Sequence, residues 1–243
     1  MIRLENLTKD FVKVRAVDGL HLEVPAGQIF GFLGPNGAGK TTTIKLITGI
    51  LQPTFGQIFI NDIDMAEKPR YAKQYIGYVP DQPFLYDRLS AREFIEFQAQ
   101  LHLIRVSEMK LRIEEIASQL DMSRWLDERI ESFSQGMRQK TAMAAALIHN
   151  PRLIILDEPL VGLDPKSARI IKDVLRERAH NGSTVFLSTH ILPIAQELCQ
   201  RLAIINHGKL IAEGTFADLK NSGDPDLEAA FLRITEEQIQ VQP

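Results

Sequence analysis

Apolar and polar residues alternate with two different periods along this chain, and the period changes from one stretch to the next. In the first third, apolar residues at every second position predict half-buried β-strands; these residues are Ile2, Leu4, Leu20, Leu22 and Val24. The short, largely apolar run 28–33 predicts a strand that is buried on both faces. After it we expect a helix over 40–51, which ends before Pro53, and strands over 57–60 and 76–79.

The middle third has the helical period instead. The segment 90–93 has the spacing of a capping box, and the apolar residues after it share one helical face: Phe94, Phe97, Leu101 and Ile104. Two more amphipathic helices are predicted over 109–120 and 136–149. We therefore expect a helical subdomain at about 85–150, inserted between two halves of mixed α/β character.

In the last third, strands and helices alternate. The pattern predicts strands over 153–157, 184–188 and 202–206, with helices over 166–179 and 191–201. Strands that alternate with helices of this length are typical of βαβ units and a largely parallel sheet. The rest of the prediction is a hairpin at His207 and Gly208, a short helix from Thr215, a polar break over 221–226 and a peripheral helix in the tail.

The composition is that of a soluble globular protein: 44% of the 243 residues are hydrophobic, 24% are charged, and the formal net charge is −3. That balance gives no overall attraction to nucleic acid or anionic lipid. No apolar run approaches the roughly 18 residues that cross a bilayer, so we expect a membrane role only through a partner. The single cysteine, Cys199, lies in an apolar-periodic stretch, which favours a buried residue in a reducing cytoplasm.

The strongest chemical signal is the segment 34–41, which matches the phosphate-binding loop pattern in full between a predicted strand and a predicted helix. Its glycines let backbone N–H groups approach phosphate oxygens at a helix N-terminus. Lys40 supplies a charge for the β- and γ-phosphates, Thr41 a hydroxyl for Mg²⁺, and Thr42 a further phosphate contact. We expect ATP and Mg²⁺ as ligands, bound by Gly34, Pro35, Asn36, Gly37, Ala38, Gly39, Lys40, Thr41 and Thr42.

Two adjacent acids follow the apolar run 153–156. Asp157 ends the predicted strand and Glu158 comes directly after it. A strand that merely emerges into solvent can end in this way, but beside a phosphate loop the pair suits metal and water chemistry. We expect Asp157 to contact the water shell of Mg²⁺ and Glu158 to act as the general base that polarises the attacking water.

The segment 133–140, Phe-Ser-Gln-Gly-Met-Arg-Gln-Lys, resembles the signature LSGGQ-x-Q-R of the ATP-binding subunits of ABC (ATP-binding cassette) transporters. It departs from that consensus at three of the first five positions, but Ser134 and Gly136 remain. A capping serine and a flexible residue at a helix start suit contact with a γ-phosphate. The resemblance extends from residue 2 to about 214, with the family's motifs in order.

Other positions match the family residue by residue. The segment 161–164 looks like the loop that communicates across the dimer, His190 looks like the switch histidine that contacts the γ-phosphate, and Phe11 looks like the aromatic residue that stacks on adenine. In the family, a loop glutamine contacts Mg²⁺ and the transmembrane partner. The corresponding position here is Asp81, and Gln82 follows it. Either Asp81 supplies the oxygen ligand or the loop shifts to present Gln82; both remain open.

The resemblance implies an α/β fold: a P-loop NTPase core with a mixed or parallel sheet, an N-terminal antiparallel β subdomain and the inserted helical subdomain. It implies one cassette over 1–220, a short tail over 221–243, and an ATPase peripheral to the cytoplasmic face of the membrane. Two copies would form a homodimer in which Ser134 and Gly136 complete the partner's ATP site. Closure on ATP would then drive an integral membrane permease.

The direction of transport and the class of ATPase each have an alternative. The segments 78–94 and 136–139 and the short tail resemble the exporter-like branch, so we expect export rather than import. The rival is a soluble ABC-type ATPase that acts on nucleic acid or ribosomes. It is disfavoured because the chain has one cassette, no long insertion between Thr41 and Asp157, and no basic character. A generic P-loop kinase or GTPase leaves the segment 133–140 and His190 unexplained.

Overall fold

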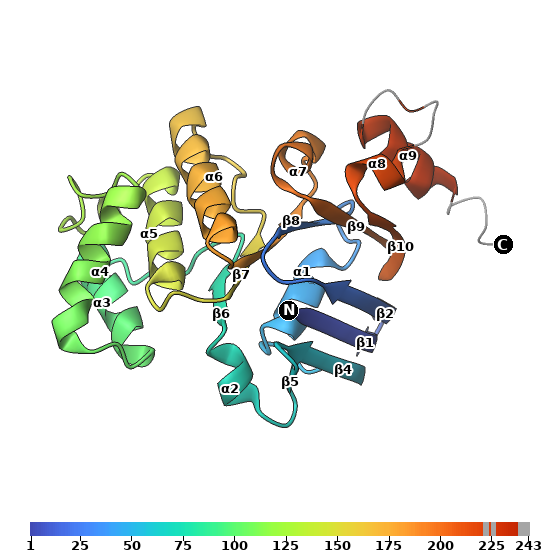
Figure 1. Cartoon of the computed structure of the whole chain (residues 1–243), viewed down its shortest axis with the longest axis horizontal. Coiled ribbons are helices and arrows are strands. Elements are labelled where there is room, and N and C mark those ends of the chain that lie inside the picture. The colour runs from blue at the N-terminus through green and yellow to red at the C-terminus, as the bar shows by residue number, and fades with distance from the viewer. Residues whose placement is uncertain (221–223, 225–226, 238–243) are drawn as a thin grey trace.

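The computed structural model describes residues 1–220, 224 and 227–237 and arranges them as two β-sheets with helices packed around them (Figure 1). The smaller sheet is antiparallel, with strand order β2-β1-β4-β5. Ile2 and Leu4 are buried in it, as the period of two predicts. This confirms the expected N-terminal antiparallel sheet, which comprises β1 (Ile2–Phe11), β2 (Val14–Val24), β4 (Phe55–Ile60) and β5 (Ile63–Asp64).

The larger sheet has the order β10-β9-β3-β8-β7-β6 and is parallel except at one edge, where β10 runs antiparallel to β9. In the register, Leu33 is paired with Thr189, and Asp157 with Ser188. The loops that follow β3, β7 and β8 therefore leave the sheet at the same edge. The strands are β3 (Ile29–Leu33), β6 (Ile76–Val79), β7 (Leu153–Asp157), β8 (Thr184–Thr189), β9 (Arg201–Asn206) and β10 (Lys209–Gly214).

Helices fill the space around the two sheets. The apolar side of α1 (Lys40–Ile47) packs in one core with both sheets, through Ile44, Leu46 and Ile47. A second core joins the larger sheet to α6 (Pro165–His180) and to the helices of the middle third. Shorter helices are α2 (Pro69–Lys73), α7 (Leu192–Leu198) and α8 (Phe216–Leu219).

The middle third forms the expected helices, at one end of the molecule beside β6 and β7 (Figure 1). Ser90 caps α3 (Ala91–Leu101) through a complete capping box with Glu93, as the sequence predicts. A 3-10 turn (Ile130–Ser132) leads from α4 (Val106–Gln119) into α5 (Gln135–Leu147). Buried residues such as Ile113 and Met143 unite α4 and α5 with the larger sheet in one core.

Two helices end three or four residues earlier than predicted. The helix expected over 40–51 ends at Ile47, because Thr48 caps it and Gly49 takes a left-handed backbone angle, φ +67°. The helix expected over 191–201 ends at Leu198, and Cys199 is extended. The reason for the second difference is tertiary: the Gln200 N–H donates to the Ile29 carbonyl, which starts the pairing of β9 with β3.

The polar break expected over 221–226 lies outside the described residues except for Asp224. Beyond it the tail contains α9 (Leu227–Glu237), as expected, with Ala230 fully buried and Phe231 and Ile234 packed against the core at α7 and β10. Within the described ranges, every helix is too short or too polar to cross a membrane.

Candidate functional site

The segment 34–39 links β3 to α1 as a tight loop whose glycines are required by its geometry. Gly37 and Gly39 have φ of +81° and +109°, which L-residues with a Cβ rarely adopt. A Cβ on Gly34 would come within 2.4 Å of the Ile205 carbonyl oxygen, and one on Gly39 within 2.5 Å of the Ala16 carbonyl oxygen. The glycines thus let the loop pack closely against β9 and β2.

Lys40 begins α1, and its ammonium group turns back into this loop. Its Nζ donates to the carbonyl oxygens of Gly34 at 2.8 Å and Pro35 at 3.3 Å, and the side chain is nearly buried. The same Nζ lies 3.6 Å from Oε1 of Glu158. A single cation is therefore fixed between the loop and the acid that follows β7, at the N-terminal end of a helix, where anions are favoured.

A cavity of about 370 Å³ opens in front of the loop. Asp81, after β6, and Glu158, after β7, line it beside the loop. The other lining residues come from the loop and α1, from β2, and from the turn between β9 and β10: Asn36, Gly37, Ala38, Gly39, Lys40, Thr41, Thr42, Val14, Arg15, Ala16, His207 and Gly208. Its volume falls within the range of small-molecule sites.

Asp157 is fully buried at the end of β7. Its Oδ1 accepts a 2.5 Å hydrogen bond from the Ser188 hydroxyl, whereas its Oδ2 is buried without a partner. Burial raises the pKa of Asp157, and the hydroxyls of Ser188 and Thr41 act in the opposite direction. A buried carboxylate oxygen beside the Thr41 hydroxyl is a suitable position for a hard cation.

Glu158 takes a left-handed backbone conformation, φ +48°, directly after β7. Its N–H donates to the backbone and side-chain oxygens of Ser188, both at 3.2 Å, which fixes this turn. Nδ1 of His190 lies 2.9 Å from Oε1 of Glu158, while Oε2 is buried without a partner. The structure thus brings Lys40, Glu158 and His190 together, although Lys40 and Glu158 are 118 positions apart in sequence.

Asp81 and Gln82 are placed differently. Asp81 lines the cavity, and its Oδ1 accepts a hydrogen bond from the Gln82 N–H at 2.8 Å. Gln82 is exposed and does not line the cavity. Of the two candidates, Asp81 is therefore the one beside the phosphate loop.

Asp157 and His190 are outside the cavity lining but contact the lining residues Thr41 and Glu158. Ser134, Gly136 and Phe11 lie away from the cavity. Ser134 caps α5 by accepting the Met137 N–H at 3.3 Å, and Gly136 packs where a Cβ would lie 3.3 Å from Asp164 Oδ2. Figure 1 shows α5 separated from α1 by β6 and β7. Phe11, at the end of β1, is half exposed beside Lys9 and does not line the cavity.

The sequence analysis missed the wall formed by β2 and the β9–β10 turn. Gly208 donates its N–H to the Ala38 carbonyl, and its own carbonyl accepts the Asp18 N–H, both at 2.9 Å. These bonds attach the turn to the phosphate loop on one side and to β2 on the other. No motif marks such residues, because long-range strand pairing alone brings them to the loop.

The described residues contain no group of three or more His, Cys, Asp or Glu side chains arranged to bind a metal ion. Thr41, Asp157 and Asp81 supply few protein oxygens. A magnesium ion at this position would therefore need phosphate oxygens or water to complete its coordination.

The family model for ABC transporters matches residues 17–161, more than half of the chain. The linearmycin resistance ATP-binding protein LnrL of Bacillus subtilis is 35% identical over 97% of this chain and 76% of its own length. The structure of an ATP-binding subunit of an ABC transporter superposes with a TM-score of 0.90 at 29% identity, covering 96% of this chain and 99% of that one.

A dimeric ATP-binding cassette in a post-hydrolysis state, bound to ADP and phosphate, is also similar. Its TM-score is 0.80 at 26% identity, over 88% of this chain and 98% of the other. The matching fold, the complete phosphate loop and the acids beside it agree with these relationships. This chain belongs to the ABC transporter family, as an ATP-binding subunit whose hydrolysis of ATP powers transport.

Proposed function

We propose that this chain energises a separate integral membrane permease that exports its cargo from the cytoplasm. The observation that carries the ATPase part of this proposal is the position of Glu158, which shares one carboxylate oxygen between Lys40 and His190 at the edge of a cavity sized for a nucleotide. The relative LnrL is named for linearmycin resistance, which supports export. Cargo contacts belong to the permease, and this chain's own residues supply the ATP chemistry.

The residues of the cavity suit distinct roles in hydrolysis. The loop N–H groups, Lys40 and Thr42 bind the phosphates of ATP. Glu158 orients the attacking water and accepts its proton, and Lys40 keeps that carboxylate aligned toward the phosphates. His190, within hydrogen-bond distance of Glu158, contacts the γ-phosphate and fixes the side chain of the base. Phe11 at the end of β1 stacks on adenine.

Magnesium fits the acidic side of this cavity. The unpartnered Oδ2 of Asp157, the Thr41 hydroxyl and the Asp81 carboxylate provide the oxygen donors that Mg²⁺ prefers. The ion would neutralise charge on the β- and γ-phosphates. Ser188 orients Asp157 through its other oxygen and so leaves Oδ2 available.

We infer that two copies of the chain form the working site. Ser134 is an exposed helix cap outside its own chain's cavity, and Gly136 beside it keeps the start of α5 free of side-chain bulk. In a head-to-tail homodimer these residues face the γ-phosphate bound to the partner's loop. The similarity to a dimeric cassette supports this arrangement. The cassette spans 1–220, with helices at 85–150 as one subdomain and α9 in the tail.

We expect the permease to bind at a second, apolar cavity of about 340 Å³, which lies along the free edge of β6. Its lining includes Phe84, which is 85% exposed, and Phe94 of α3. Tyr86 and Phe97 extend the aromatic surface, with ring centroids 5.8 Å apart. Exposed aromatic residues around an apolar groove favour a protein partner. We place the chain at the cytoplasmic face of the membrane through this contact.

The test is co-purification of the tagged chain from detergent-solubilised membranes. Phe84→Glu should release a multi-spanning membrane subunit without lowering ATP binding, whereas the matched control Phe55→Glu, on exposed β4, should retain it. Inside-out vesicles with the assembled complex should accumulate the cargo in an ATP-dependent manner. Retention of ribosomes or DNA in place of a membrane subunit would contradict the proposal.

A further inference from the structure

Arg15, on β2, lines the nucleotide cavity on the side away from the catalytic acid. The phosphate loop lies between them: Lys40 Nζ lies 3.6 Å from Glu158, while Gly39 abuts β2 at Ala16. Since this lysine takes the β- and γ-phosphates, a nucleotide bound here extends its nucleoside toward β2. Arg15 therefore borders the position of the ribose and base.

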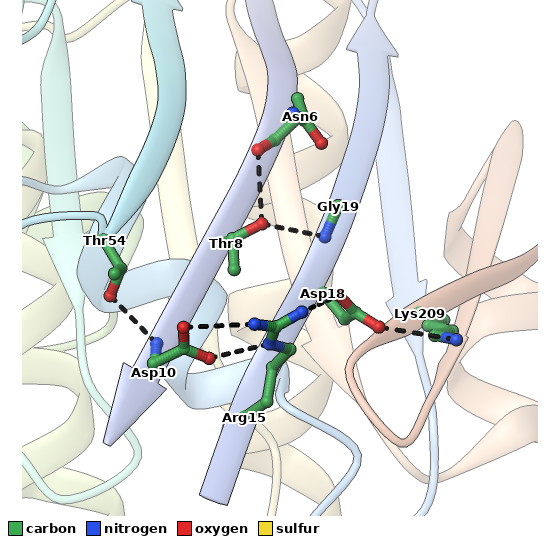
Figure 2. Close-up of polar contacts among 8 residues, drawn as sticks. All are labelled: Asn6, Thr8, Asp10, Arg15, Asp18, Gly19, Thr54 and Lys209. Carbon is green, nitrogen blue, oxygen red and sulfur yellow. Dashed lines mark hydrogen bonds and ion pairs between the residues drawn. The ribbon is translucent and has the colours of Figure 1, made fainter. Parts of the chain in front are cut away.

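Two carboxylates fix the guanidinium group of Arg15 (Figure 2). Asp10, its cross-strand partner on β1, accepts from Nε at 2.7 Å and from Nη2 at 3.3 Å, in a bidentate pair. Asp18 accepts from Nη1 at 3.0 Å, and its other oxygen lies 3.4 Å from Lys209 Nζ. Bidentate pairing fixes the plane of the group as well as its position.

The backbone around this pair is fixed too. The Asp10 N–H donates to the Thr54 hydroxyl at 3.0 Å, and the Gly19 N–H donates to the Thr8 hydroxyl at 3.0 Å, as Figure 2 shows. These bonds tie β1 to the segment before β4 and to β2. The end of the β1–β2 hairpin is thereby held in one register, with Arg15 presented to the cavity.

The charges in this cluster cancel. Arg15 and Lys209 carry two positive charges, and Asp10 and Asp18 carry two negative ones. Attraction of phosphate is therefore a poor explanation for Arg15 at the cavity wall. Arg15 can still offer a ligand the flat face of its guanidinium group, because 52% of its side chain is exposed. Two of its guanidinium N–H bonds are also not used by the carboxylates.

We infer that Arg15 is a further nucleoside-binding residue: its clamped guanidinium plane stacks against the base of the bound nucleotide, in addition to the adenine contact proposed for Phe11. A rigid planar cation is well suited to stack on a π-system, and it needs no base-specific hydrogen bond. Arg15 thus strengthens binding of ATP and ADP alike. The inference rests on nucleotide binding at the phosphate loop and does not depend on the permease or on export.

The test compares three ligands on the full chain: ATP, ADP and inorganic tripolyphosphate. Arg15→Met should weaken ATP and ADP by a similar factor, about five- to thirtyfold, and leave tripolyphosphate affinity unchanged. Arg15→Lys, which keeps the charge but loses the plane, should weaken both nucleotides as well. The control is Arg3→Met, which removes another ion-paired arginine of the same sheet outside the cavity.

Unchanged ATP affinity in both Arg15 variants would overturn the inference. Equal losses for nucleotides and tripolyphosphate would also overturn it, because they would indicate a structural or phosphate-directed role. If Arg15→Met does not fold, as judged by its thermal unfolding, Arg15→Lys decides by the same comparison. Failure of the wild-type chain to bind any of the three ligands would instead contradict the phosphate loop assignment itself.

Discussion

Nδ1 of His190 lies 2.9 Å from Oε1 of Glu158, the same oxygen that lies 3.6 Å from Nζ of Lys40. One carboxylate oxygen thus joins residues that follow β8, β7 and β3. The parallel register creates this convergence, since the three strands end at the same edge of the sheet. The left-handed backbone at Glu158 then turns its side chain toward the loop.

Glu158→Gln tests the base. The amide keeps the size of the side chain but cannot accept the proton of the attacking water, so phosphate release should fall by about 100-fold or more. ATP binding should persist, and size-exclusion chromatography with ATP should show more dimer. Undiminished hydrolysis would remove Glu158 from its assigned role.

Lys40→Ala tests the loop. Loss of the buried ammonium removes the positive charge between the loop carbonyls and Glu158 and leaves His190 as the remaining partner of that acid. Calorimetric titration should show ATP affinity reduced by about tenfold or more. Lys45→Ala, one turn further along α1, is the control and should bind normally; equal binding by Lys40→Ala would count against the phosphate loop assignment.

Because His149 is buried, we expect the free energy of unfolding of this protein to depend on pH. Burial, with the nearby His102, lowers the pKa of His149 to about 4, and its Nε2 donates to the Ile76 carbonyl. Between pH 6.5 and 4 the unfolded imidazole binds a proton that the folded one does not, so stability falls as pH falls through this window. We expect a loss of about 1–2 kcal/mol between pH 7 and pH 5.

Urea unfolding of the wild type at both pH values measures this loss, and His149→Gln should be less pH-dependent by that amount. His180→Gln, which removes an exposed histidine at the end of α6, should retain the wild-type dependence. Identical pH dependence in wild type and His149→Gln would show that His149 is not the group responsible.

We expect the thiol of Cys199 to be alkylated slowly in the folded protein. Burial raises the pKa of Cys199 to about 12, so little thiolate exists near neutral pH. Alkylation by iodoacetamide at pH 8 should be about 1000-fold slower in the folded chain than in urea. Mass spectrometry of the labelled chain provides the readout, and rapid labelling of the folded protein would refute the packing described for β9 and α7.

The sequence predicted the elements of the fold well where local pattern and tertiary packing agree. The buried strand before Gly34 and the capped helix after Ser90 are examples, because period and capping chemistry are local properties. It failed at Cys199, where pairing of β9 with β3 overrides an apolar pattern of helical period. The predicted division into a cassette and a tail remains a prediction.

In the site, too, the sequence identified residues that belong to a recognisable motif but not those placed by tertiary packing. Lys40, Asp157 and Glu158 carry recognisable chemistry, and the structure brings Lys40 and Glu158 within 3.6 Å of each other. Arg15 and Gly208 could not be found, because their place at the cavity depends on how β2 and the β9–β10 turn pack against the loop. The roles of Phe11, Ser134 and Gly136 require ligand or partner and remain predictions.

The central claim is that the loop of one copy works with Ser134 of another. The most direct test mixes two inactive variants, Glu158→Gln and Ser134→Arg, before ATP is added. In a mixed dimer one site combines an intact loop and base with an intact signature serine. ATP hydrolysis should therefore reappear on mixing, and it should stay absent when Glu158→Gln is mixed with Lys40→Ala, because both changes lie in the same half-site. No recovery in the first mixture, despite mixed dimers being present, would contradict the composite site.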